Sequence, residues 1–297
     1  MRCIDLENNA ECSFAANAAV ALGNFDGVHL GHRALFDALG DAPRAVFTFA
    51  DLRPDGLICT LAERLSLIGA CGVRYAAVAD FADVRQIPAP RFVELLCESL
   101  GARRLVCGYN FTFGAGGVGT ADDLRTYAAG YGVETVVVPA VKIDGEVVSS
   151  SRVRELLAAG DMTGAAGLLG RRYGFTLPVV HGRELGRRMG YPTVNQLFPA
   201  ELCLPRFGVY ASVCTVRGEA RGGVTNVGMR PTVGGDAVTV ETHIFDCADD
   251  LYGEDVRVEL CEFLRPERRF DTVDELFAQI AEDAQGAKSA LRAVISL

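Results

Sequence analysis

The first half of the chain alternates short apolar runs with amphipathic stretches. Strands are predicted over residues 17–23, 44–49, 75–78, 105–108 and 134–138, and helices over 31–39, 61–71, 91–100 and 121–130. Strands and helices that alternate at this spacing predict a parallel sheet covered on both faces. Ligands of such sheets bind beyond the carboxyl ends of the strands. Two further short helices are predicted over 151–159 and 162–169.

After residue 170 the pattern becomes rich in strands. Short β-like runs, separated by Gly, Pro and Asp, lie at 178–181, 209–216, 223–227, 238–245 and 256–264. Such a series predicts a small barrel or sandwich. Thr272 and Glu275 form a capping-box signal and begin a C-terminal helix with an apolar stripe. The sequence therefore predicts an α/β domain over 1–170, followed by a β-rich domain over 171–297.

Composition and charge narrow the class of protein. Hydrophobic residues make up 49% and charged residues 23%, which is typical of a globular chain and excludes a disordered or fibrous one. The net charge of −9 argues against a nucleic-acid partner. No two of the ten cysteines are close enough to form a CxxC pair. No apolar run approaches the roughly 18 residues that span a membrane. We therefore expect a cytoplasmic protein with reduced thiols and no membrane partner.

The first candidate site lies between the first predicted strand and the first predicted helix. Residues 23–32 read Gly-Asn-Phe-Asp-Gly-Val-His-Leu-Gly-His. Unpaired N–H groups at a helix start favour anions, and glycines let the backbone approach a ligand closely. His29 and His32 share one side of the helix and are placed to stabilise charge on a phosphate. A simple capping turn with two surface histidines, or half a metal site, remains an alternative here.

The second candidate site combines a glycine-rich loop with a polar tripeptide. Gly182 and Gly186 indicate a loop of close approach, and Thr193 and Asn195 after Pro192 offer neutral oxygens of the kind that suit Mg²⁺ bound with ATP phosphates. Residues 171–240 hold nine arginines against four acids, a balance that suits a polyphosphate ligand. Glu241 is placed to accept the proton of an alcohol substrate, although alone it also fits a solvent-facing acid on a strand.

These segments resemble a known family. Residues 23–32 resemble the HxGH motif of nucleotidyltransferases and, over the longer string, bacterial bifunctional riboflavin kinase/FAD synthetases. Residues 108–114 and 148–154 resemble further motifs of the adenylyl-transferring half, and the kinase half is matched in the family's order by residues 192–195, 208–210, 226–232, 240–243, 251–253 and 263–270. The resemblance implies a Rossmann-like nucleotidyltransferase domain, then a small six-stranded β-barrel kinase domain with a C-terminal helix.

The resemblance also implies the chemistry. The enzyme would phosphorylate riboflavin with ATP to FMN, then adenylylate FMN to FAD with release of pyrophosphate. Its substrates are ATP, riboflavin and FMN, and Mg²⁺ accompanies ATP. In the kinase half, Gly182, Gly186, Pro192, Thr193 and Asn195 bind the nucleotide, Thr193 and Asn195 hold the metal, and Glu241 is the base on the riboflavin 5′-hydroxyl. In the adenylyl-transferring half, His29 and His32 are catalytic, and the binding residues are Gly23, Phe25, Asp26, Gly27, Gly31, Asn110, Ser150, Ser151, Arg152 and Arg154.

The chain departs from the family pattern in two places. Residues 48–54 lack the usual histidine, and residues 115–119 lack a basic residue. A riboflavin kinase with a degenerate adenylyltransferase domain is therefore one alternative. Two others are a flavin- or nucleotide-binding protein without turnover and an adenylyltransferase for another metabolite. The sequence supports no prediction of the oligomeric state.

Overall fold

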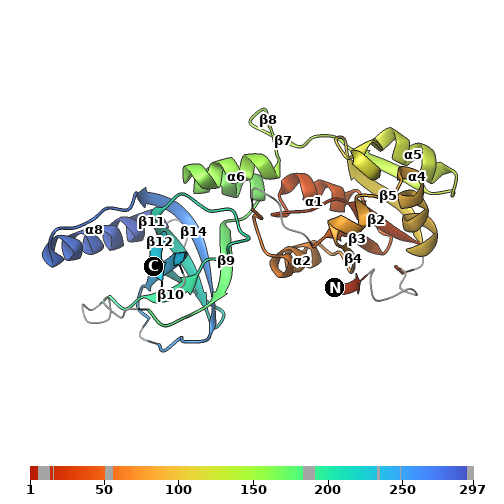
Figure 1. The fold of residues 1–297 in the computed structure, drawn as a ribbon. Helices are drawn as coiled ribbons and strands as arrows, with labels where there is room; N and C mark the ends of the chain where they lie inside the picture. The colour runs from red at the N-terminus through yellow and green to blue at the C-terminus, as the bar shows by residue number, and fades with distance from the viewer. Residues whose placement is uncertain are drawn as a thin grey trace. The chain divides into compact units, whose positions relative to one another are not determined.

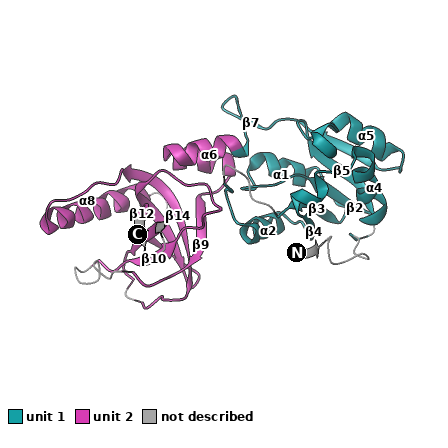
Figure 2. Ribbon diagram, in the orientation of Figure 1, with its two compact units in different colours: residues 1–150 teal, residues 151–297 magenta. Residues whose placement is uncertain are grey.

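The chain folds into two compact units, residues 1–150 and 151–297, which are coloured separately in Figure 2. The structure, a computed structural model, describes residues 1–5, 14–15, 17–50, 56–182, 191–232, 235–247 and 249–292. Each unit is described by itself.

The first unit is built on a six-stranded sheet in which every neighbouring pair is parallel. The strand order is β1-β4-β3-β2-β5-β6, so the chain begins at one edge of the sheet with β1 and ends at the other edge with β6. The sheet confirms the predicted α/β class and adds one strand, β1, that the sequence did not predict. The strands are β1 (Arg2–Asp5), β2 (Ala18–Leu22), β3 (Arg44–Phe49), β4 (Tyr75–Ala79), β5 (Ala102–Gly108) and β6 (Glu134–Val138).

Apolar side chains cover both faces of this sheet. Val20 and Leu22 belong to one buried cluster, and the alternate residues Ala19 and Ala21 belong to a second. Because successive side chains of a strand point to opposite faces, one strand serves both cores. The helices are α1 (Leu30–Asp37), α2 (Leu61–Ala70), α3 (Phe81–Val84), α4 (Ala89–Glu94) and α5 (Ala121–Ala129). A π-helical turn continues α4 over Leu95–Ser99, a 3₁₀ turn spans Ala115–Gly117, and β7 (Lys142–Ile143) pairs with β8 (Glu146–Val147).

The second unit is built on a six-stranded antiparallel sheet with the order β10-β13-β12-β11-β14-β9. Two short helices, α6 (Ser150–Ala159) and α7 (Met162–Leu169), precede it, and α8 (Val273–Leu291) follows it. Figure 1 shows α8 lying along the curled sheet. The strands are β9 (Tyr173–Pro178), β10 (Val194–Leu197), β11 (Gly208–Val216), β12 (Glu219–Thr232), β13 (Gly235–Ile244) and β14 (Asp255–Arg265).

Side-chain contacts link the two ends of this sheet. The Gln196 amide on β10 donates to the carbonyl oxygens of Leu177 on β9 (2.7 Å) and Val256 on β14 (2.9 Å). Val180 and Asn195 form an isolated bridge between the same ends. The sheet therefore curls toward closure, as the small-barrel prediction requires.

Two predicted elements differ from the structure. The strand predicted over 178–181 is wrong, because β9 ends at Pro178 and its apolar residues Tyr173, Phe175 and Leu177 alternate before that point. The helix predicted over 91–100 begins earlier, at Ala89, directly after Pro88. Proline is compatible with a helix start because its missing N–H has no partner there.

Candidate active sites

A strained loop joins β2 to α1 in the first unit. Phe25, Gly27 and Val28 have φ values of 53°, 77° and 43°, all in the left-handed region. For residues other than glycine this region costs about 1–2 kcal/mol each. The buried Asp26 carboxylate offsets the strain by accepting the N–H groups of Ile58 (2.9 Å) and Cys59 (3.4 Å).

Three more side chains hold the same loop from other elements. Arg64 on α2 is fully buried and donates to both the carbonyl oxygen and Oδ1 of Asn24, each at 2.7 Å. The Thr48 hydroxyl donates to the same carbonyl at 3.0 Å. The Ser150 hydroxyl, at the start of α6, donates to the Asp26 carbonyl at 3.0 Å. The loop is therefore fixed before any ligand arrives.

The two histidines sit at the amino end of α1. His29 is the N-cap, and its Nδ1 accepts the His32 backbone N–H at 3.2 Å. Because Nδ1 is an acceptor, the neutral ring carries its proton on Nε2. The two rings stack with centroids 3.6 Å apart. A Cβ on Gly31 would lie 3.0 Å from the His29 ring, so a glycine suits this position.

The other predicted residues of this unit take different places. Phe25 is buried and packs against Phe36 and the edge of the His32 ring, while a Cβ on Gly27 would collide with Ile58 at 2.9 Å. These two residues support the loop from inside. Asn110 is exposed just beyond β5.

The predicted residues on α6 beyond Ser150 belong to the second unit. Ser151 is exposed, and Arg152 pairs with Glu155 on the same helix at 3.0 Å. Arg154 is half-buried.

An aromatic cavity of about 490 Å³ lies beside Gly23, where β2 and β3 end. The sequence did not predict it, although residues 111–113 read Phe-Thr-Phe within the matched stretch 108–114. Its phenylalanines come from four separate segments of the chain, and several contact each other edge-to-face or tilted. They are Phe47, Phe49, Phe81, Phe92, Phe111 and Phe113.

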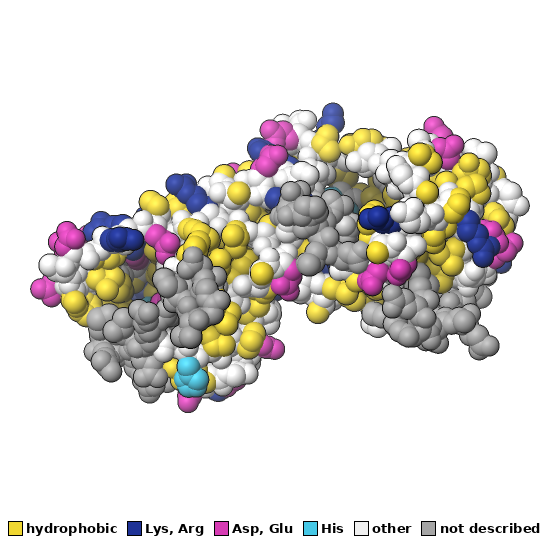
Figure 3. Space-filling view, in the orientation of Figure 1, with side chains coloured by type: hydrophobic (Ala, Val, Ile, Leu, Met, Phe, Trp, Pro, Cys, Tyr) yellow, Lys and Arg dark blue, Asp and Glu magenta, His cyan; other side chains and the backbone are white. Residues whose placement is uncertain are grey.

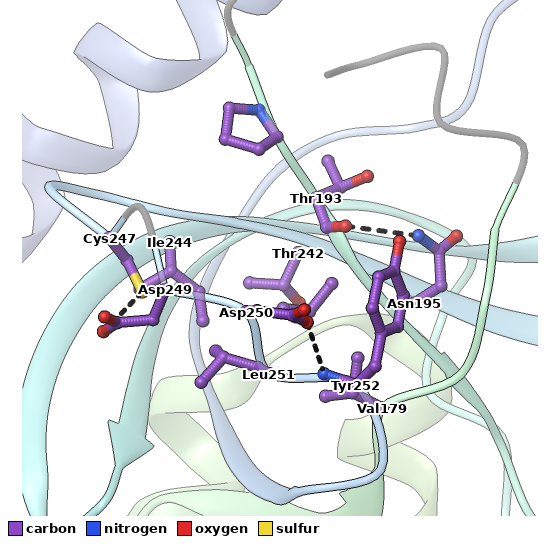
Figure 4. Close-up of a pocket in the computed structure, with 12 residues that line it drawn as sticks. Val179, Thr193, Asn195, Thr242, Ile244, Cys247, Asp249, Asp250, Leu251 and Tyr252 are labelled. Atoms are coloured by element: carbon purple, nitrogen blue, oxygen red, sulfur yellow. Dashed lines mark hydrogen bonds between the residues drawn. The ribbon is translucent and has the colours of Figure 1, made fainter.

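A second cavity, of about 290 Å³, lies in the β-rich unit (Figure 4). Thr193, Asn195 and Tyr252 lie on one side of it, and Cys247 and Asp249 on the other. Asn195 Nδ2 donates to the Thr193 carbonyl at 3.3 Å, which leaves the Asn195 Oδ1 for another partner. The structure thus brings Thr193 and Asn195 together at one cavity.

Glycine is needed beside this cavity. A Cβ on Gly182 would lie 2.5 Å from Cγ of Asn195, so any larger residue would displace that amide. Pro192 also lines the cavity, and its carbonyl accepts the Nδ1–H of His243 at 2.9 Å. Gly186 lies outside the described residues, and so do residues 51–55, which include most of the 48–54 segment that lacks the family's usual histidine.

Glu241 lies on β13, the second strand from one edge of the sheet, between two asparagines of the neighbouring strands. Its direct partners are Asn195 on β10 and Asn226 on β12. It alternates along β13 with Thr242 and Ile244, which line the cavity, so its side chain leaves the opposite face of the strand. Asn195 lines the cavity and is also the cross-strand partner of the half-buried Glu241.

Eight cysteines within the described residues form no disulfide, and five of them are buried. Burial raises the pKa of Cys97 and of Cys107 to about 11, and that of Cys214 to about 12. These thiols stay protonated and unreactive near neutral pH. Cys247 differs because it lines the second cavity and is partly exposed.

Comparisons with known proteins match each half of the chain to a family. The FAD synthetase family model matches residues 12–152, and the riboflavin kinase model matches residues 169–291. The bifunctional riboflavin kinase/FMN adenylyltransferase of Escherichia coli K12 is 36% identical, with 91% of each chain covered. The chain belongs to this bifunctional family. The Bacillus subtilis relative of the same name is 32% identical, with 92% of each chain covered. A crystal structure described as a macrolide-efflux protein from Streptococcus pneumoniae is 30% identical with a TM-score of 0.86, and the match covers 95% of this chain and 97% of that one.

This bifunctional enzyme phosphorylates riboflavin with ATP and adenylylates FMN. The matches cover both halves, so they favour the two activities over a kinase alone, a binder without turnover or an adenylyltransferase for another metabolite. The family suggests a divalent metal requirement in general. Among the described residues, no group of three or more His, Cys, Asp or Glu could hold a metal ion, and no helix is long and apolar enough to cross a membrane.

Proposed function

We propose that residues 1–170 carry FMN adenylyl transfer and residues 171–297 carry riboflavin phosphorylation. The FAD synthetase match ends at residue 152 and the riboflavin kinase match begins at residue 169, which supports this division. The histidine loop and the aromatic cavity both lie in the first unit, and the Thr193–Asn195 cavity lies in the second. We further propose that the enzyme acts in the cytoplasm, where ATP is supplied.

In the kinase half, Asn195 carries the proposal, because it lines the cavity and is also the direct neighbour of Glu241. The neutral oxygens of Thr193 and Asn195 fit Mg²⁺, a hard cation that takes much of its shell from substrate phosphates. The metal, when bound, neutralises charge on the phosphates of ATP. Glu241 accepts the proton of the riboflavin 5′-hydroxyl as that oxygen bonds to the γ-phosphorus and ADP leaves.

In the adenylyl-transferring half, an oxygen of the FMN phosphate attacks the α-phosphorus of ATP, and pyrophosphate leaves. His29 offers Nε2–H to the phosphate oxygens, and the amino end of the α1 dipole adds to the positive potential there. Because the loop is already fixed by Asp26, Arg64 and Ser150, little reorganisation accompanies the reaction.

We propose that the aromatic cavity takes the flavin ring of FMN. A flat aromatic ring suits a cavity of this size lined by phenylalanines, and Gly23 at its edge leads into the histidine loop. The test is Phe111→Ala, which removes a half-buried lining ring. We expect the KM for FMN in FAD formation to rise about tenfold, with an unchanged KM for riboflavin in the kinase reaction. An unchanged KM for FMN would refute this placement.

The kinase site has a separate test. Thr193→Ala removes one of the two neutral oxygens, so riboflavin phosphorylation should fall steeply and need more Mg²⁺ for half-maximal rate. Thr193→Ser keeps the hydroxyl and is the matched control, which should retain the wild-type dependence on Mg²⁺. If both variants show the same Mg²⁺ dependence, Thr193 does not act at the metal.

A further inference from the structure

Two polar side chains at the edge of the aromatic cavity have no partner among the residues that the structure describes. Arg85 and Gln86 follow α3 and are exposed, and both line the cavity. Within the described part of the chain, neither side chain forms a hydrogen bond or an ion pair. A cation and an amide that line an otherwise aromatic cavity indicate that the ligand itself has a polar edge.

Other arginines of the first unit are in a different situation. Arg91, Arg104 and Arg125 each pair with a carboxylate of the same unit. Figure 3 shows basic and acidic side chains close together in several places on the face in view. Arg85 is therefore distinguished from these three both by its place on the cavity and by its lack of a counter-charge.

The sheet order separates the two polar ends of the cavity. Gly23 follows β2, Arg85 and Gln86 lie beyond β4, and β3 runs between these strands (Figure 1). Neighbouring strands are about 4.8 Å apart, so the ends of β2 and β4 lie roughly 10 Å from each other. A tricyclic ring can cross this distance over Phe47 and Phe49 of β3. Its phosphate-bearing chain would then lead from the ring toward Gly23.

We propose that Arg85 and Gln86 recognise the pyrimidine edge of the flavin ring and so determine which flavins this site accepts. That edge presents an N–H between two carbonyl groups. A glutamine amide both donates and accepts, which matches the N3–H and one carbonyl, and a guanidinium donates to the other carbonyl. The apolar dimethylbenzene end then lies among the phenylalanines. The inference rests on the proposed placement of FMN in this cavity.

The experiment compares FMN with 3-methyl-FMN, in which a methyl group replaces the N3 hydrogen. In FAD formation by the full-length enzyme, Gln86→Ala should raise the KM for FMN about fivefold and leave the KM for 3-methyl-FMN unchanged. Arg85→Ala should raise the KM for both substrates about tenfold, and Arg85→Lys should raise it less because the lysine keeps a positive charge and a donor. None of these three variants should change kcat, because recognition of the ring is the same in the ground and transition states.

The matched control is Arg74→Ala, an exposed arginine just before the opposite end of β4. The inference is overturned if Arg85→Ala changes the KM for FMN no more than Arg74→Ala does. It is also overturned if Gln86→Ala affects both flavins equally. Phe111→Ala distinguishes a failure of this inference from a failure of the flavin placement. If Phe111→Ala raises the KM for FMN while the Arg85 and Gln86 variants do not, only the recognition of the pyrimidine edge is refuted. If Phe111→Ala has no effect, the placement of the flavin fails as well.

Discussion

The strained histidine loop predicts the outcome of one substitution in detail. Asp26→Ala removes the carboxylate that accepts the backbone N–H groups of Ile58 and Cys59. Both of these residues are buried. A buried N–H group that loses its acceptor costs about 1–3 kcal/mol, so the two together cost about 2–6 kcal/mol. Without this anchor, Phe25 and Val28 are free to leave their left-handed conformations.

We expect FAD formation to suffer and riboflavin phosphorylation to be spared. Each 1.4 kcal/mol corresponds to about tenfold, so the lower bound of the cost predicts a loss of about 30-fold in kcat/KM for FMN. The assay measures both half-reactions on one preparation, with FMN and FAD resolved by chromatography. Asp26→Asn keeps one acceptor oxygen and should lose less. The reasoning is refuted if Asp26→Ala impairs both activities equally, or neither.

Three further substitutions or treatments have definite outcomes. Gly182→Ala places a Cβ against the Asn195 amide and should raise the KM for ATP in the kinase reaction about tenfold, with FAD formation unaffected; an unchanged KM contradicts this. Alkylation of Cys247 should inactivate the kinase reaction because the thiol lines the cavity, and ATP with Mg²⁺ should protect against it. A Cys247→Ala enzyme that the reagent inactivates at the wild-type rate would contradict this prediction. Asp283→Ala leaves the Arg265 guanidinium without the carboxylate that it contacts at 2.7 and 2.8 Å, and should lower the free energy of urea unfolding of the second unit by about 3–5 kcal/mol. Arg265→Ala and the double alanine variant complete the test. If the two single losses simply add in the double variant, the pair is not coupled and the prediction is contradicted.

Local chemistry made the histidine loop predictable from the sequence. A glycine-rich turn followed by two histidines at a helix start needs no long-range information to be identified as an anion site. The structure adds why Asp26 and Gly27 stand there, since both contact Ile58 in a segment that is distant in sequence. These residues support the loop, and that role cannot be inferred from spacing alone.

Long-range contacts explain what the sequence did not predict. The strand β10 reads Val-Asn-Gln-Leu, and its Gln196 is completely buried because its amide meets two carbonyls across the curled sheet. A polar residue in that place is typical of a loop until those carbonyls are known. The aromatic cavity combines rings from β3, α3, α4 and the 111–113 segment, and only the tertiary fold brings them together.

The division of labour between the two sites is the central claim, and one paired measurement tests it most directly. Purified Glu241→Gln and His29→Asn enzymes are each supplied with ATP, Mg²⁺ and either riboflavin or FMN, and the products are resolved. Asparagine keeps the helix cap at position 29 but not the imidazole. The account predicts that Glu241→Gln makes FAD from FMN but no FMN from riboflavin, whereas His29→Asn makes FMN but no FAD. The account is contradicted if either variant loses both activities. It is also contradicted if Glu241→Gln still phosphorylates riboflavin or if His29→Asn still makes FAD.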